Sequence, residues 1–129
     1  MTLKEIIPAE LLEFLETILP RESDAVVAQY VSECNAEGSD PIVEAIRFNN
    51  PNASKYEFSY VVFEQLVNGK IDVMYGTPRS DCNYKWTSAT DLIKQLVKSH
   101  YVASEDTKHL KFTEPTPAIT ATKVSMDFD

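Results

Sequence analysis

The chain has 129 residues, of which 43 % are hydrophobic and 25 % charged. It is long enough to bury a core within one domain, and this composition excludes global disorder. The formal net charge of −8 at pH 7 argues against direct binding to nucleic acid or to a membrane surface. No basic segment precedes a long apolar run, so we expect neither a signal peptide nor a membrane span, and we expect a cytoplasmic protein.

The negative charge is concentrated in the first 50 residues, which hold ten acidic and three basic side chains. Residues 51–100 are nearly neutral, with five acids and six bases. An acidic N-terminal third suits a partner with a basic surface, because complementary electrostatic fields speed encounter. The ordinary alternative is that these acids only keep the protein soluble.

The first two predicted elements are helices. Pro8 opens a run of apolar residues at helical spacing that ends at Leu19, where a further proline stops it. A second helix is predicted from Ser23 to about Ala36, with Gly38 closing it. The apolar stripe of this second helix consists of Val27, Tyr30, Val31 and Cys34, and Cys34 is predicted to be a small core residue.

Strand patterns follow the helices. The Asp-Pro pair that begins residues 40–48 would suit the start of a helix, but we interpret this segment as a first strand. Residues 56–75, rich in aromatic and β-branched side chains, predict a β-hairpin around the Asn-Gly pair at 68–69. A two-residue loop pairs Val67 with Lys70 and so decides which side chains share a face. The face predicted to pack against helices consists of Tyr56, Phe58, Tyr60, Val62, Leu66, Ile71, Val73 and Tyr75.

The rest of the chain predicts a loop, a third helix and an arm. Residues 76–86 are interpreted as a loop, and a pattern resembling a capping box at Ser88 opens the helix. Periodicity is lost over residues 104–129, so this C-terminal arm is predicted to be flexible or to order on a partner. Alternatively, residues 109–112 and 118–126 each form a short edge strand.

Together these elements predict an α+β fold with one domain over residues 1–103. It contains two N-terminal helices, an antiparallel meander centred on the 56–75 hairpin, and one helix packed on the sheet. Residues 104–129 form the arm.

No motif indicates a catalytic or metal site. The four side chains Cys34, Cys82, His100 and His109 lack the spacing of metal ligands, and no glycine-rich strand-to-helix turn suits a phosphate. A nucleophilic Cys82 with one of the histidines is a combination that composition alone produces. We therefore predict a non-catalytic protein with two free thiols and without metal or cofactor.

Two surfaces are candidate binding sites. The 76–86 loop gathers Arg79, Tyr84 and Trp86, which are residue types enriched at binding hot spots; the alternative is that Trp86 packs into the core. The other candidate is a row of helical acids that would resemble phosphates, made of Glu10, Glu13, Glu16, Glu33 and Glu37.

The predicted function is that of an acidic protein-interaction module. It would act as an inhibitor, adaptor or nucleic-acid mimic on a protein with a basic surface, as small phage-encoded or accessory proteins do, and a homodimer is compatible with this. Two alternatives stay open. One is a small-ligand-binding domain or minor enzyme with a pocket near Tyr60, Tyr75, Arg79 and Cys82. The other is a structural subunit of a larger assembly.

Overall fold

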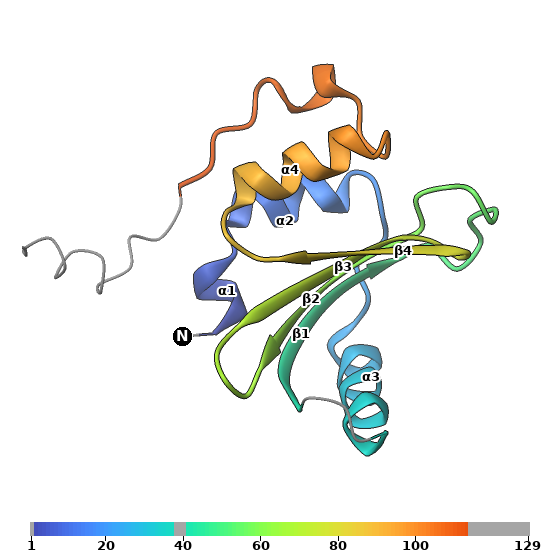
Figure 1. Cartoon of the computed structure of the whole chain (residues 1–129), viewed down its shortest axis with the longest axis vertical. Coiled ribbons are helices and arrows are strands. Elements are labelled where there is room, and N and C mark those ends of the chain that lie inside the picture. Colours follow the sequence, from blue (N-terminus) through green and yellow to red (C-terminus); the bar gives the residue numbers. More distant parts are fainter. Residues whose placement is uncertain (1, 38–40, 114–129) are drawn as a thin grey trace, which may run out of the picture.

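The central element is a four-stranded antiparallel sheet whose strands follow one another in chain order (Figure 1). The computed structural model describes residues 2–37 and 41–113. The predicted α+β fold, with a meander sheet and a helix packed on it, is confirmed. In chain order the elements are α1 (Leu3–Ile6), α2 (Ala9–Glu16), α3 (Asp24–Ala36), β1 (Ile42–Asn49), β2 (Tyr60–Leu66), β3 (Ile71–Thr77), β4 (Ser80–Lys85), α4 (Ala89–Lys98) and a 3-10 helix (Ser104–Thr107).

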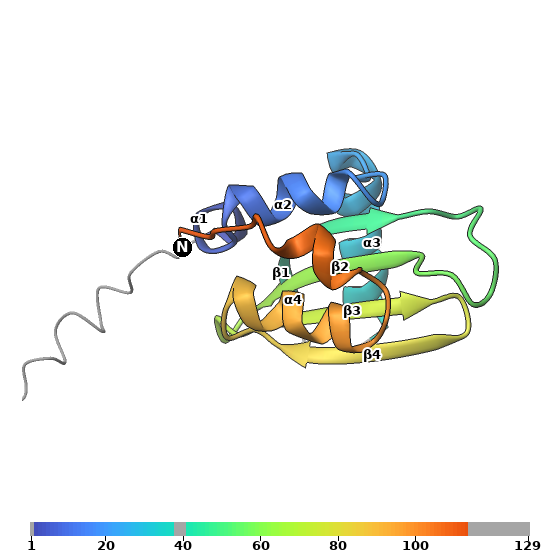
Figure 2. The same ribbon diagram turned by 90° about the horizontal axis from the view of Figure 1, so that it is seen from above.

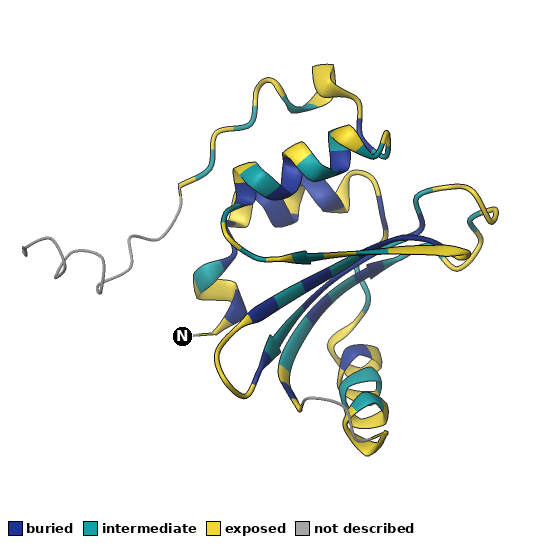
Figure 3. Cartoon of the chain, viewed as in Figure 1, coloured by how far each residue is buried: buried dark blue, intermediate teal, exposed yellow. Residues whose placement is uncertain are grey.

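The hydrophobic core lies between the sheet and the layer formed by α2 and α4 (Figures 1 and 2). Both helices turn their buried sides toward the strands (Figure 3). Phe48 of β1 and Phe63 of β2 have no exposed surface, and neither has Leu92 of α4. Burying side chains of this size contributes about 1.5–3 kcal/mol each, so this face carries most of the stability of the fold.

The N-terminal region contains one more helix than predicted. The predicted run from Pro8 to Leu19 forms only α2, which ends at Glu16, while Leu3–Ile6 forms the separate helix α1. Pro8 caps α2 instead of lying in its first turn. Proline separates the two helices because it lacks an N–H and disfavours helical geometry in the residue before it.

Helix α3 begins where predicted, since the Ser23 hydroxyl accepts a hydrogen bond from the N–H of Val26 at 3.3 Å. Of the four residues in its predicted apolar stripe, Val27 is buried and the other three are half-buried. Cys34 is half-buried instead of being a core residue. The reason is that α3 packs on the second, largely polar face of the sheet. Gly38, the predicted end of this helix, lies outside the described residues.

The first strand, predicted within residues 40–48, is present as β1, and the predicted hairpin is present too, but the hairpin register is one residue from the prediction. Gln65 lies opposite Ile71, and the N–H of Leu66 donates to the carbonyl of Lys70. The loop therefore has three residues and ends in Gly69, whose φ is +88°. A left-handed glycine closing a three-residue loop is a common hairpin alternative to the two-residue Asn-Gly turn.

The register decides which side chains of β2 face the helices. Side chains alternate along a strand, so a slip of one residue moves each of them to the other face. Val61 and Phe63 join Val73 in the core. Tyr60 and Val62, predicted on the helix-covered face, lie on the opposite face.

The prediction of a loop over residues 76–86 is wrong, because most of these residues form strand β4. Only Pro78 and Arg79 form the turn, in which the Thr77 hydroxyl accepts bonds from the N–H groups of Arg79 at 3.2 Å and Ser80 at 3.1 Å. The strand is rich in polar residues because it lies at an edge of the sheet, where one face stays exposed.

The described part of the C-terminal arm forms no strand at residues 109–112. Instead, Leu110 and Phe112 pack against the core after the 3-10 helix. The predicted strand at 118–126 lies outside the described residues. Within the described residues, no helix is long and apolar enough to cross a membrane, and both cysteines are free.

Candidate functional site

The face of the sheet opposite α2 and α4 carries a groove that we call the sheet groove. Helix α3 contacts β1 on this side, and Figure 1 shows it across the sheet from α2 and α4. The groove has a volume of about 310 Å³. Its lining is Tyr30, Arg47, Asn49, Tyr60, Val62, Glu64, Met74 and Asp81.

Tyr30 and Glu64 form the first tyrosine–carboxylate pair of the groove. The Tyr30 phenol, on α3, donates a hydrogen bond to the Glu64 carboxylate on β2. Burial, reinforced by this bond, raises the pKa of Tyr30 above its ordinary value, so the phenol stays a neutral donor. The Arg47 guanidinium lies 4.6 Å from the centre of the Tyr30 ring and pairs with Glu22 at 2.9 Å.

Tyr60 and Asp81 form the second pair, which bridges β3. In the register of the sheet, Tyr60 lies opposite Gly76, and Gly76 lies opposite Asp81. The Tyr60 phenol donates to the Asp81 carboxylate across the glycine. Burial and this bond raise the pKa of Tyr60. A Cβ at Gly76 would lie 2.0 Å from the carbonyl oxygen of Ser80, so the arrangement requires glycine there.

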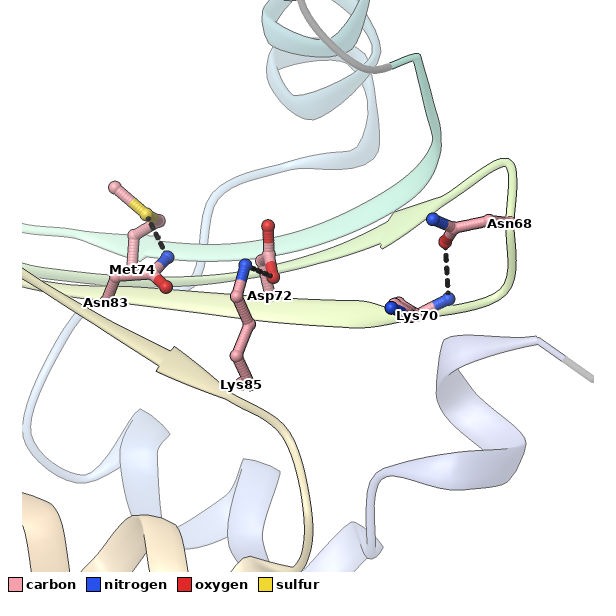
Figure 4. Close-up of polar contacts among 6 residues, drawn as sticks. All are labelled: Asn68, Lys70, Asp72, Met74, Asn83 and Lys85. Carbon is pink, nitrogen blue, oxygen red and sulfur yellow. Dashed lines mark hydrogen bonds and ion pairs between the residues drawn. The ribbon is translucent and has the colours of Figure 1, made fainter.

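On the same face of the sheet, polar contacts join side chains of β3 and β4 beside the groove (Figure 4). The Lys85 ammonium pairs with Asp72 at 2.7 Å, and the Asn83 amide nitrogen donates to the Met74 sulfur at 2.9 Å. Asp72 is thus balanced by a cation, as Glu22 is. Among the described residues, the carboxylates of Glu64 and Asp81 have neutral phenols as partners and no ion pair.

Two larger hollows lack this convergence of groups. One, of about 810 Å³, lies between α2 and the arm and is lined by both acidic and basic side chains, including Glu10 and Lys111. The other, of about 400 Å³, lies between α3 and β1. Three basic and three acidic side chains line it, so it has no net charge: Lys4, Arg21, Arg47, Glu22, Asp24 and Glu44.

The predicted row of helical acids does not form a single surface. Glu10, Glu13 and Glu16 are exposed on α2, on one side of the sheet, whereas Glu33 and Glu37 lie with α3 on the other side (Figure 1). Glu16 pairs with Arg21 at 3.4 Å, and the Glu33 carboxylate accepts from Gln29 at 3.1 Å.

The predicted hot spot at Arg79, Tyr84 and Trp86 is spread along β4. The half-buried Trp86 packs edge-on against Phe63, with ring centres 5.9 Å apart. The Tyr84 phenol bonds the Thr87 hydroxyl at 2.7 Å. Arg79 lies in the turn at the opposite end of the strand.

The residues predicted to line a ligand pocket also lie apart. Tyr75 and Cys82 are neighbours on the helix-covered face, where Tyr75 packs against Tyr101 with ring centres 6.1 Å apart. Tyr60 points to the sheet groove on the other face. These residues therefore do not converge on one point.

The residues of β2 that line the sheet groove could be recognised in the sequence only as alternate positions of a predicted strand. Tyr60, Val62 and Glu64 share a face through the two-residue period of a strand, and the correct register would have placed Met74 beside Val62. Nothing in the sequence pairs Tyr30 with Glu64, because the two lie 34 positions apart.

The described residues contain no cluster of three or more potential metal ligands. The chain matches no known family model, no curated protein and no solved structure.

Proposed function

We propose that this chain is a non-catalytic interaction module that binds basic side chains of a partner protein in the sheet groove. The observation that carries the proposal is the pair of carboxylates, Glu64 and Asp81, which accept hydrogen bonds from neutral tyrosine phenols and form no ion pair among the described residues. Such a module would act in the cytoplasm as an inhibitor or adaptor.

The chemistry of the groove suits an arginine or lysine side chain. Each carboxylate accepts one bond from a phenol that carries no positive charge, so it can accept a charge-assisted bond from a second, cationic donor. The Tyr30 ring already has Arg47 at 4.6 Å from its centre, whereas the Tyr60 ring offers a face that attracts a cation by about 0.5–2 kcal/mol. Val62 and Met74 lie between the carboxylates, where they would contact the aliphatic stem of the incoming side chain.

The net charge favours a basic partner over other ligand classes. At −8, the protein attracts basic surfaces over distances of about 10 Å at moderate ionic strength and repels phosphates. A groove open on the face of a sheet suits a protruding side chain of a protein better than an enclosed small molecule. The exposed acids of α2 would add to this attraction without forming the site.

The test compares two pairs of isosteric substitutions that remove the same charge. The variant with Glu64→Gln and Asp81→Asn keeps acceptors for both phenols, and the control with Glu10→Gln and Glu13→Gln alters α2. NMR titrations would use three short peptides that differ at one position, which is arginine, lysine or norleucine. We expect the two cationic peptides to bind wild type and the α2 control, with a salt-sensitive affinity reduced at least about tenfold in the groove variant.

Two results would contradict the proposal. Equal binding of the norleucine peptide would show that the carboxylates do not select a cation. Loss of binding in the α2 control, with retention in the groove variant, would place the site on the helix.

A further inference from the structure

The two edge strands of the sheet, β1 and β4, differ in how far the rest of the described chain covers their outer backbone groups. At β1, the Asn35 side chain donates to the carbonyl of Ile42 at 3.0 Å and accepts from its N–H at 2.8 Å. Farther along, the carbonyl of Arg47 accepts from the N–H of Glu22 and the N–H of Asn49 donates to the carbonyl of Pro20, both at 2.9 Å. The chain thus covers much of this edge itself, as proteins do to prevent unwanted pairing.

The β4 edge has no such cover within the described residues. The N–H of Trp86 donates to the carbonyl of Ile71 at 3.0 Å, which makes the even-numbered residues of β4 the ones that bond to β3. Asp81, Asn83 and Lys85 therefore direct their backbone groups outward. In Figure 2 no element of the described chain lies beyond β4, and all three side chains are exposed.

We propose that the β4 edge pairs antiparallel with the β4 edge of a second copy of this chain, giving a continuous sheet across a two-fold axis. The inference does not depend on the proposed function. A register centred on Asn83 uses all three outward residues of each strand and forms about six backbone hydrogen bonds. It sets Asp81 opposite Lys85 of the second copy, and Lys85 opposite its Asp81.

Charge complementarity is the reason to choose a second copy as the partner. Opposite charges facing each other across strands stabilise the pair by about 0.2–1 kcal/mol each, and a two-fold axis makes the contact occur twice. A shift of two residues in one direction would set Lys85 against Arg79, and the opposite shift would leave Asp81 without its cation. The register with the most hydrogen bonds is therefore also the one with matched charges.

The dimer would be weak and linked to the sheet groove. A single strand edge buries little surface, and exposed ion pairs contribute little. Lys85 already binds Asp72 at 2.7 Å, so in the dimer it would lie between two carboxylates. Asp81 belongs to both surfaces, so a basic ligand and a second copy would compete for it.

The experiment measures association of the full chain by sedimentation velocity from micromolar to millimolar concentration. We expect wild type to dimerise at the high end. Asp81→Lys and Lys85→Asp, which set like charges opposite each other, should each weaken the dimer about tenfold or more. The matched control Lys94→Asp changes the charge equally on the exposed side of α4 and should leave association unchanged.

Mixing the two reversed variants gives the sharpest test. In a mixed dimer, the two cations on β4 of the Asp81→Lys chain face the two carboxylates on β4 of the Lys85→Asp chain, so the mixture should dimerise although neither variant does alone. In addition, Asn83→Pro removes an N–H that points outward, so it should block pairing while circular dichroism shows a retained fold. A wild type that stays monomeric, a mixture that stays monomeric, or a dimer unaffected by Asn83→Pro would each overturn the proposal.

Discussion

Substitution of Gly76 tests whether the β3–β4 hairpin has room for any side chain. The φ of Gly76 is +157°, and an added Cβ would lie 2.0 Å from the carbonyl oxygen of Ser80. Gly69 is a matched comparison, because its φ is +88° but nothing lies within 4 Å of an added Cβ. Both alanine substitutions incur the strain of a positive φ, of order 1–3 kcal/mol. Only Gly76→Ala must also displace backbone atoms, at a cost of about 1–3 kcal/mol more.

We therefore expect Gly76→Ala to lower the free energy of unfolding by about 2–6 kcal/mol and Gly69→Ala by about 1–3 kcal/mol. Urea denaturation, followed by circular dichroism and by the fluorescence of Trp86, measures both values, and an unchanged m-value keeps the comparison valid. Equal losses in the two variants would refute the reasoning, because the close approach to Ser80 would then carry no cost.

Two further predictions concern pH and the core. The raised pKa values of Tyr30 and Tyr60 mean that their contribution to stability is complete below about pH 10, the ordinary tyrosine pKa. Above that pH it is lost, because the unfolded state releases the protons first. The denaturation midpoint should therefore fall in alkali, and fall less steeply in a variant with Tyr30→Phe and Tyr60→Phe; identical slopes would contradict this. Phe63→Ala should cost about 3–5 kcal/mol and shift the emission of Trp86, which the Phe63 ring contacts edge-on. Val67→Ala, at a side chain that is 67 % exposed, should cost almost nothing, and comparable losses would show that burial does not set the difference.

The helices and the hairpin could be predicted because local signals specify them. Ser23 and Ser88 cap α3 and α4 as their sequences indicate, each hydroxyl accepting a backbone N–H three residues later. The helix α1 was missed because it is short and is stabilised by a distant residue, since the N–H of Leu3 donates to the carboxylate of Glu44 at 2.9 Å. Strand β4 was missed because its many polar residues hide the strand pattern, although it pairs with its neighbour β3.

The candidate site was harder to predict because the signal for a binding surface is spatial. Acidic side chains at helical spacing are conspicuous in the sequence, yet the sheet separates those of α2 from those of α3. In contrast, Glu64 reads as an ordinary polar position within a strand. It becomes distinctive only when α3 brings Tyr30 to it and no cation of the described residues forms an ion pair with its carboxylate.

The hairpin loop connects the fold to the proposed site. Ile71, Val73 and Tyr75 face the helices, so the loop length determines whether the odd or the even residues of β2 join them. A two-residue loop would shift the pairing of β2 with β3 by one residue, so that Glu64 and Val73 would share a face. Glu64 would then enter the core as a buried charge, which is costly without a partner. The left-handed Gly69 adds the one residue that lets Phe63 fill the core while Glu64 faces Tyr30. The placement of Tyr60 and Glu64 on the groove face thus follows from the hydrophobic requirement of the opposite face.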